Sequence, residues 1–245
     1  MSATTQTAGR AAGPQPEARI SVYVWDLPLR VIHWTIALSL FVLAATGFAI
    51  GQPFISVPGE ARDHFVMGTM KAVHFYAAIA FTVAVLSRLW WMLAGNRWAS
   101  WRQLVPTTRA RRHRFVDTLR FYTFLRVDAP PEIGHNPAAG LAYFLVYLLC
   151  LVEIATGLAL FGASAAWDSP LRGFAGLATL LGGLQIVRWI HHLVMWLLLG
   201  FFVHHLASAI LVSSVEGNGL MGSIFSGSKF VTREELERER REGSP

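Results

Sequence analysis

Four histidines lie within one apolar stretch, RWIHHLVMWLLLGFFVHHLASAILVSS, which covers residues 188–214. From Trp189 to Val215 the chain contains no Asp, Glu, Lys or Arg. This length and hydropathy are typical of a transmembrane helix, in which an imidazole is costly and needs a reason to be present. At 100° per residue, His191 and His205 share one helix face and lie about 21 Å apart along the axis. One helix thus presents two imidazoles at two depths, as the axial ligands of two stacked haems would require.

The composition indicates an integral membrane protein. Of 245 residues, 53% are hydrophobic and 15% charged, and the mean hydropathy is +0.43. The basic residues cluster in particular loops, which membrane topology explains better than a nucleic-acid interface, so no nucleic-acid partner is expected. The single cysteine, Cys150, excludes disulfides, iron–sulfur clusters and haem attachment through a C-x-x-C-H motif within this chain. Any haem must therefore be held by histidine.

The apolar segments predict an all-α fold, a four-transmembrane-helix bundle with haems between the helices. A disordered tail is expected over residues 1–20, the transmembrane domain over 21–215, and a C-terminal tail over 216–245. Within the domain, the hydropathy pattern predicts helices over residues 29–50, 66–94, 138–161 and 187–214.

The remaining segments carry weaker signals. Residues 115–126 resemble an amphipathic helix on the membrane surface. Asn136 and Pro137 are typical of a helix start. The Gly-rich piece 173–184 is too short to span and is expected to be re-entrant or interfacial. In the C-terminal tail, Thr232 and Glu235 form a capping-box pattern that begins a short solvated helix.

The distribution of basic residues predicts the orientation. Three lie in the N-terminal segment through Arg30, eight in residues 95–137 and five in the C-terminal tail, whereas the loops 51–65 and 163–187 have one each. By the positive-inside rule, both termini face the cytoplasm of a multi-pass protein in the bacterial inner membrane.

The helix directions then place the histidines in two pairs. His33 and His205 lie toward the cytoplasmic side, and His74 and His191 toward the outer side, so that each pair would ligate the iron of one haem b. The alternative for any one of them alone is an ordinary polar residue near the interface. Four histidines at matched depths, two of them on one face, favour the haem interpretation. His192 and His204 face away from the shared face and are not expected to be ligands.

Cations accompany the predicted ligands. Arg30, Lys71 and Arg188 each lie three residues before one of these histidines, one helical turn nearer the interface. Arg88 follows His74 by fourteen residues and shares its face. Because haem propionates are carboxylates near the interface, these cations are candidate partners for them. The alternative is that they simply extend from the helix ends into water.

With these residues in place, the chain resembles the b-type cytochrome subunit of membrane-bound NiFe-hydrogenases over about residues 22–230. The resemblance rests on the motifs VYVWDLPLRVIHW, ATGFAIG, RLWWMLAGNRW, GHNPAAG, ATGLALFG and IHHLVMWLLLGFFVHH, and on the GEA and FVMGTMKAVHF segments. In that family a four-helix cytochrome with two haems anchors a periplasmic hydrogenase and passes its electrons to quinone. The motifs carry the axial ligand role to His33, His74, His191 and His205, the same four that helix geometry selects. After the last helix, SSVEGNGLMGSIFSG departs from the basic and acidic start expected of hydrogenase relatives.

The resemblance implies that the chain is an electron conduit between the iron–sulfur subunit of a periplasmic oxidoreductase, here the hydrogenase small and large subunits, and membrane quinone. Two alternatives stay open: the cytochrome subunit of a molybdenum enzyme, and a self-sufficient dihaem oxidoreductase that oxidises superoxide. A transporter with a histidine proton path is a third. A quinone site is hardly legible, and the candidates are His135, at the start of the third helix, and Glu153, an acid within the membrane.

Overall fold

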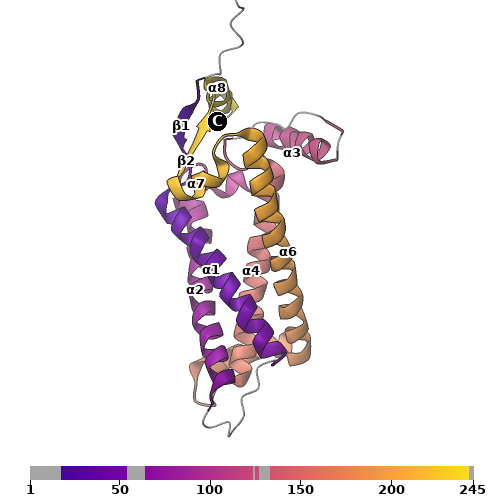
Figure 1. Cartoon of the computed structure of the whole chain (residues 1–245). Helices are drawn as coiled ribbons and strands as arrows, with labels where there is room; N and C mark the ends of the chain where they lie inside the picture. Colours follow the sequence, from indigo (N-terminus) through magenta and orange to yellow (C-terminus); the bar gives the residue numbers. More distant parts are fainter. Residues whose placement is uncertain (1–17, 54–63, 124, 127–132, 243–245) are drawn as a thin grey trace, which may run out of the picture.

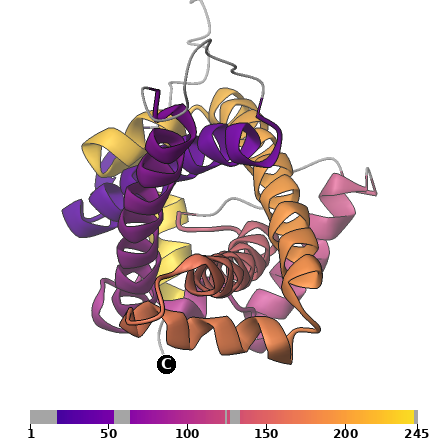
Figure 2. The same ribbon diagram turned by 90° about the horizontal axis from the view of Figure 1, so that it is seen from below.

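The computed structural model describes residues 18–53, 64–123, 125–126 and 133–242. Four long helices run side by side in this part of the chain (Figure 1), namely α1 (Leu27–Gly51), α2 (Val66–Ala94), α4 (Pro137–Ser164) and α6 (Leu184–Glu216). α1 packs most extensively against α2, and α4 against α6. Viewed along the bundle, the four helices surround a common axis (Figure 2). Each is long and apolar enough to cross a membrane, which confirms the predicted four-helix membrane architecture.

Local signals define the helix ends. Asp26 caps α1 by accepting a hydrogen bond from the Leu29 amide at 3.2 Å, and a proline lies in the first turn. Asn136 caps α4 in the same way, accepting from the Ala139 amide at 2.7 Å, as predicted for this position. α6 ends at Glu216, and the capping residue Gly217 has a φ of 56°, in the left-handed region that glycine adopts without strain.

The bundle has a small buried cluster inside and an apolar exterior. A buried cluster joins α2, α4 and α6 near the middle and consists of Phe81, Val85, Cys150, Val194 and Leu198. Only 17–28% of the residues in the most hydrophobic window of each long helix are buried inside the protein. The outward-facing side chains are nevertheless apolar, as expected where lipid replaces protein as the covering layer.

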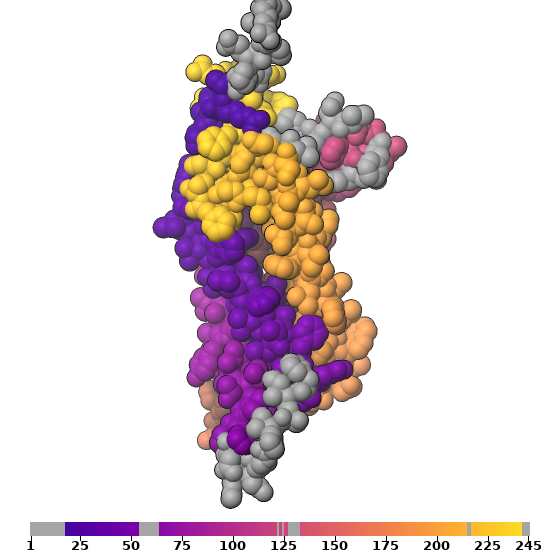
Figure 3. Space-filling view, in the orientation of Figure 1, coloured from indigo at the N-terminus to yellow at the C-terminus, as the bar shows by residue number. Residues whose placement is uncertain are grey.

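The two ends of the described chain meet at one end of the bundle. Strand β1 (Ile20–Tyr23) pairs antiparallel with β2 (Ser228–Val231), and the short helices α7 (Leu220–Ser226) and α8 (Arg233–Glu242) flank β2. Figure 1 shows this sheet beyond the start of α1, and Figure 3 shows α7 against α1, with α6 along the same face of the molecule. We call this the sheet end of the bundle.

This sheet was not predicted from the sequence, because each strand has only four residues. Of the predicted tail 1–20, residues 1–17 lie outside the described residues, and Ile20 begins β1. The capping box is confirmed: the Thr232 amide donates to Glu235 Oε2 at 2.8 Å, and the Glu235 amide donates to Thr232 Oγ1 at 3.2 Å.

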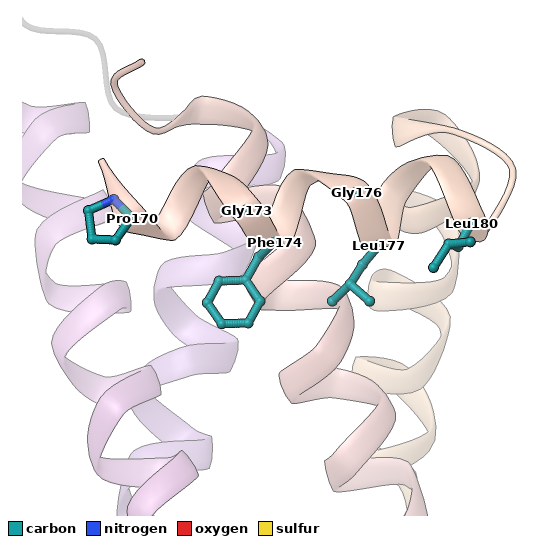
Figure 4. Close-up of a pocket in the computed structure, with 6 residues that line it drawn as sticks. All are labelled: Pro170, Gly173, Phe174, Gly176, Leu177 and Leu180. Carbon is teal, nitrogen blue, oxygen red and sulfur yellow. The ribbon is translucent and has the colours of Figure 1, made fainter. Parts of the chain in front are cut away.

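Shorter helices occupy the connections. The amphipathic helix expected at 115–126 begins earlier, as α3 (Arg109–Tyr122), after a 3₁₀ turn η1 (Trp101–Gln103), because Thr108 caps it. At the far end, the 3₁₀ turn η2 (Pro170–Phe174) and α5 (Ala175–Leu180) cross between α4 and α6. An open apolar hollow is lined by Pro170, Gly173, Phe174, Gly176, Leu177 and Leu180. Figure 4 shows the side chains of Phe174 and Leu177 directed to the side on which the long helices extend, as in an interfacial segment.

Candidate haem-binding sites

His33 of α1 and His205 of α6 face each other near the sheet end of the bundle. Their ring centroids are 6.4 Å apart, with an interplanar angle of 60°. Because a metal–imidazole bond is about 2 Å long and the ring centre lies about 1 Å further, two axial imidazoles place their centres about 6 Å apart. The separation of these two rings therefore suits a pair of axial ligands.

Neighbouring aromatic side chains orient His205. Phe201, one turn earlier on α6, stacks on its ring with centroids 5.6 Å apart and planes 9° apart. The hydroxyl of Tyr143, from α4, lies 3.3 Å from His205 Nδ1. His33 packs edge-on against Trp34, and its Nδ1 is buried with no hydrogen-bond partner among the described residues. This partly buried imidazole thus has binding capacity that the described protein groups leave unused.

The other two predicted ligands lie toward the far end, His74 on α2 and His191 on α6. Both are partly buried, and they interact electrostatically with each other. Thr46 of α1 places its Oγ1 2.8 Å from His74 Nδ1, and Thr156 of α4 places its Oγ1 2.9 Å from His191 Nδ1. All four long helices therefore contribute to this second pair.

The remaining histidines of α6 turn away from both pairs. His192 is exposed, and its Nδ1 lies 2.8 Å from the Arg188 carbonyl oxygen of its own helix. His204 is exposed as well, and its Nε2 lies 3.4 Å from Ser208 Oγ, also on α6. The helix register thus agrees with the fourteen-residue spacing that selected His191 and His205.

The four cations lie in different surroundings. The Arg30 guanidinium donates to the Phe225 carbonyl, and Arg88 is 3% exposed and donates to the Ala99 carbonyl at 3.1 Å. Lys71 and Arg188 are exposed near the far end. Their contact with haem propionates stays a prediction.

His135 lies beside the sheet-end pair, outside the long helices. Its ring packs against Trp25 and Tyr143, with centroids 4.7 and 5.1 Å away, and Tyr143 in turn contacts His205. Burial, followed by repulsion from the cations Arg88, Lys229 and Arg111 and from His205, lowers the pKa of His135 to about 3. This imidazole is therefore neutral at physiological pH, and its Nδ1 is buried without a hydrogen-bond partner in the described structure.

Glu153 lies at the other pair. Its Oε1 is 3.3 Å from His191 Nδ1, and its Oε2 is buried without a hydrogen-bond partner among the described residues. The two predicted quinone residues thus belong to different ends of the bundle, and the structure does not bring them together.

Three residues that contact the histidines were not predicted from the sequence, namely Thr46, Thr156 and Tyr143. The repeated Ala-Thr-Gly in ATGFAIG and ATGLALFG was the available signal for the two threonines.

Histidines arranged in pairs suit a metal cofactor whose own ring supplies most of the ligands of the metal ion. Within the described residues, no three or more His, Cys, Asp or Glu side chains gather as they would around a metal ion held by protein alone. Haem supplies four nitrogen ligands from its ring, so a pair of imidazoles completes the coordination of its iron. The paired arrangement fits haem.

Comparison with known proteins agrees with this chemistry. Residues 24–227 match the model of the family described as prokaryotic cytochrome b561. A Cupriavidus necator protein named probable Ni/Fe-hydrogenase B-type cytochrome subunit is 38% identical over 210 residues, 84% of this chain and 86% of the relative. Proteins of that name from Azotobacter vinelandii (36% identity; 84% of this chain, 88% of the relative) and Rhizobium leguminosarum bv. viciae (34%; 93% and 97%) are also similar. The chain therefore belongs to the prokaryotic cytochrome b561 family, membrane-spanning b-type cytochromes that carry haem b.

Proposed function

We propose that this chain is the membrane subunit of a NiFe-hydrogenase, that it holds two haems b, and that it conveys electrons from the hydrogenase to membrane quinone. The names of the relatives support the partner, because each is a hydrogenase cytochrome subunit similar to this chain over most of its length. The placement of the histidines supports the cofactor count.

The ligands are His33 with His205 for one haem and His74 with His191 for the other. The observation that carries this assignment is the 6.4 Å separation between the His33 and His205 rings, close to the separation of about 6 Å expected for two imidazoles that bind one metal ion. Haem b with two imidazole ligands has no open coordination position, so the chemistry that it supplies is one-electron transfer. The surrounding side chains of α2, α4 and α6 are apolar and exclude water from the space between the pairs.

The sheet end faces the cytoplasm of a bacterial inner membrane. Both ends of the described chain, at residues 18 and 242, lie there, together with the arginines of α3 and α8, and the positive-inside rule favours this orientation. The His74–His191 pair is then the outer one, nearest an iron–sulfur subunit on the periplasmic side. Arg30, Lys71, Arg88 and Arg188 are the proposed propionate partners.

Quinone reduction consumes protons, and the two candidate proton-handling residues mark two candidate places for quinone. His135 lies at the cytoplasmic end and is neutral, because burial and neighbouring cations lower its pKa to about 3. Glu153 lies beside His191, on the outer half. His135→Gln and Glu153→Gln would tell them apart: the variant at the quinone site loses quinone reduction while both haems remain reducible by hydrogen.

The assignment is tested with the full chain purified in mild detergent. We expect two non-covalent haems b per chain with low-spin spectra, the hydrogenase subunits in the same preparation, and hydrogen-dependent reduction of both haems. A single haem, or a high-spin spectrum that changes with carbon monoxide, contradicts the ligand assignment. Co-purification with a molybdenum enzyme would identify that enzyme as the partner in place of the hydrogenase. Turnover of superoxide by the chain alone would instead show a self-sufficient oxidoreductase.

A further inference from the structure

Two Thr-Gly pairs occupy equivalent positions against the outer histidines. Thr46 and Gly47 of α1 contact His74 of α2, and Thr156 and Gly157 of α4 contact His191 of α6. In each case Thr Oγ1 lies 2.8 or 2.9 Å from Nδ1 of the imidazole. A β-carbon on the glycine would lie 3.5 Å from Cε1 of His74 and 3.4 Å from Cε1 of His191. Both imidazoles thus lie against the same local structure, built twice.

The direction of these hydrogen bonds follows from the other contacts of the threonines. The hydroxyl of Thr46 donates to the Val42 carbonyl at 2.7 Å, and that of Thr156 donates to the Val152 carbonyl at 2.8 Å. We assign the one hydroxyl hydrogen to the helix backbone, so that Oγ1 accepts from the imidazole. Nδ1 therefore carries a proton in both histidines, and the lone pair is on Nε2, the nitrogen left to bind a metal.

The sheet-end histidines lack this arrangement. His33 Nδ1 is buried without a hydrogen-bond partner among the described residues, and His205 Nδ1 has only a longer contact, 3.3 Å, with the Tyr143 hydroxyl. Among the four predicted ligands, the threonine contact is thus found only at His74 and His191. It is therefore not a feature that every histidine inside this bundle shares.

We propose that Thr46 and Thr156 are positioning residues of the outer haem, which fix the tautomer of both axial ligands and lower the reduction potential of that haem. This inference rests on the proposed ligand role of His74 and His191. A hydrogen bond from Nδ1–H to an oxygen makes the imidazole a stronger electron donor, and this favours the oxidised iron. Removing the acceptor should therefore raise the potential of that haem alone.

Thr46 gives the cleaner test. At His191, Glu153 Oε1 is a second acceptor 3.3 Å from Nδ1 and can replace the Thr156 hydroxyl. At His74, the other acceptor is the Leu43 backbone carbonyl, which both Thr46→Val and Thr46→Ser leave in place. Thr46→Val keeps the shape of the side chain and removes its oxygen, whereas Thr46→Ser keeps the oxygen. Thr35→Val is the matched control, because the Thr35 hydroxyl also donates to the carbonyl four residues earlier, Val31 at 2.9 Å, with no histidine contact described for it.

The full-length variants are compared by haem content, optical redox titration and the electron paramagnetic resonance of the ferric haems. We expect Thr46→Val to raise the midpoint potential of one of the two haems and to shift its low-spin signal, with Thr46→Ser and Thr35→Val close to wild type. Loss of one haem in Thr46→Val with full content in Thr46→Ser also supports a role of the hydroxyl.

Two results would overturn the positioning role. The first is a Thr46→Val protein that keeps both haems with unchanged midpoint potentials and resonance signals. The second is a change in potential in Thr46→Ser or Thr35→Val that equals the change in Thr46→Val. Failure of the ligand assignment gives a different pattern, because His74→Ala would then keep both haems. The experiment therefore separates this inference from the proposed function on which it rests.

Discussion

His33 and His205 come from the first and last of the long helices, yet their rings face each other with centroids 6.4 Å apart. If each pair of histidines holds one haem, loss of either member should remove the same haem. We expect His33→Ala and His205→Ala to lose one spectral component, and His74→Ala and His191→Ala to lose the other, as measured by haem content and redox titration. Loss of the same component in His33→Ala and His74→Ala would disprove the pairing.

His192 and His204 provide the complementary test. Both are exposed and contact their own helix, so His192→Gln and His204→Gln should retain two haems, with the wild-type absorption spectrum. His191→Gln and His205→Gln are the matched comparisons, one residue away. A haem lost from His204→Gln but kept in His205→Gln would show that the register of α6 is wrong.

The sheet end depends on a buried hydrogen bond between distant segments. Trp25 Nε1 donates to Ser223 Oγ at 2.9 Å, and Ser223 is 1% exposed. Ser223→Ala leaves the indole N–H buried without an acceptor, which costs about 1–3 kcal/mol. We expect a lower thermal unfolding midpoint in detergent. The control is Ser214→Ala, whose exposed hydroxyl donates only within its helix turn, to the Ile210 carbonyl; an equal loss in both variants would refute the prediction.

His135 should make the protein less stable in acid. Its pKa is about 3 in the folded chain and 6.5 as an ordinary histidine, so the unfolded chain binds the proton more readily. The contribution of this pKa difference to the free energy of unfolding is fully present above pH 6.5 and is lost as pH falls from 6.5 toward 3. Over that range the free energy of unfolding changes by up to about 1.4 kcal/mol per pH unit.

His135→Gln removes this titration. The difference in stability between wild type and His135→Gln should therefore shrink between pH 7 and pH 5, as measured by the thermal midpoint at several pH values in the same detergent. A difference independent of pH would mean that His135 is already charged or solvated in the folded protein.

Local sequence determined the parts of this protein that depend on near neighbours. The four apolar spans could be predicted because hydropathy and helix length are properties of a single segment. In the structure, α1, α2, α4 and α6 begin and end within a few residues of the predicted bounds. The Asn136 cap and the Thr232–Glu235 capping box could be predicted for the same reason. So could the shared face of His191 and His205, which follows from the helix repeat alone.

Tertiary structure decided what distant segments do to one another. The contacts of Thr46 with His74 and of Thr156 with His191 join different helices, and the repeated Ala-Thr-Gly that contains both threonines does not indicate which histidine each one contacts. Likewise, β1 and β2 are too short to be recognised, and they form because the two ends of the described chain meet. The burial of His135 between Trp25 and Tyr143 also needs three segments in place. Such contacts depend on the spatial arrangement of helices, which no local periodicity encodes.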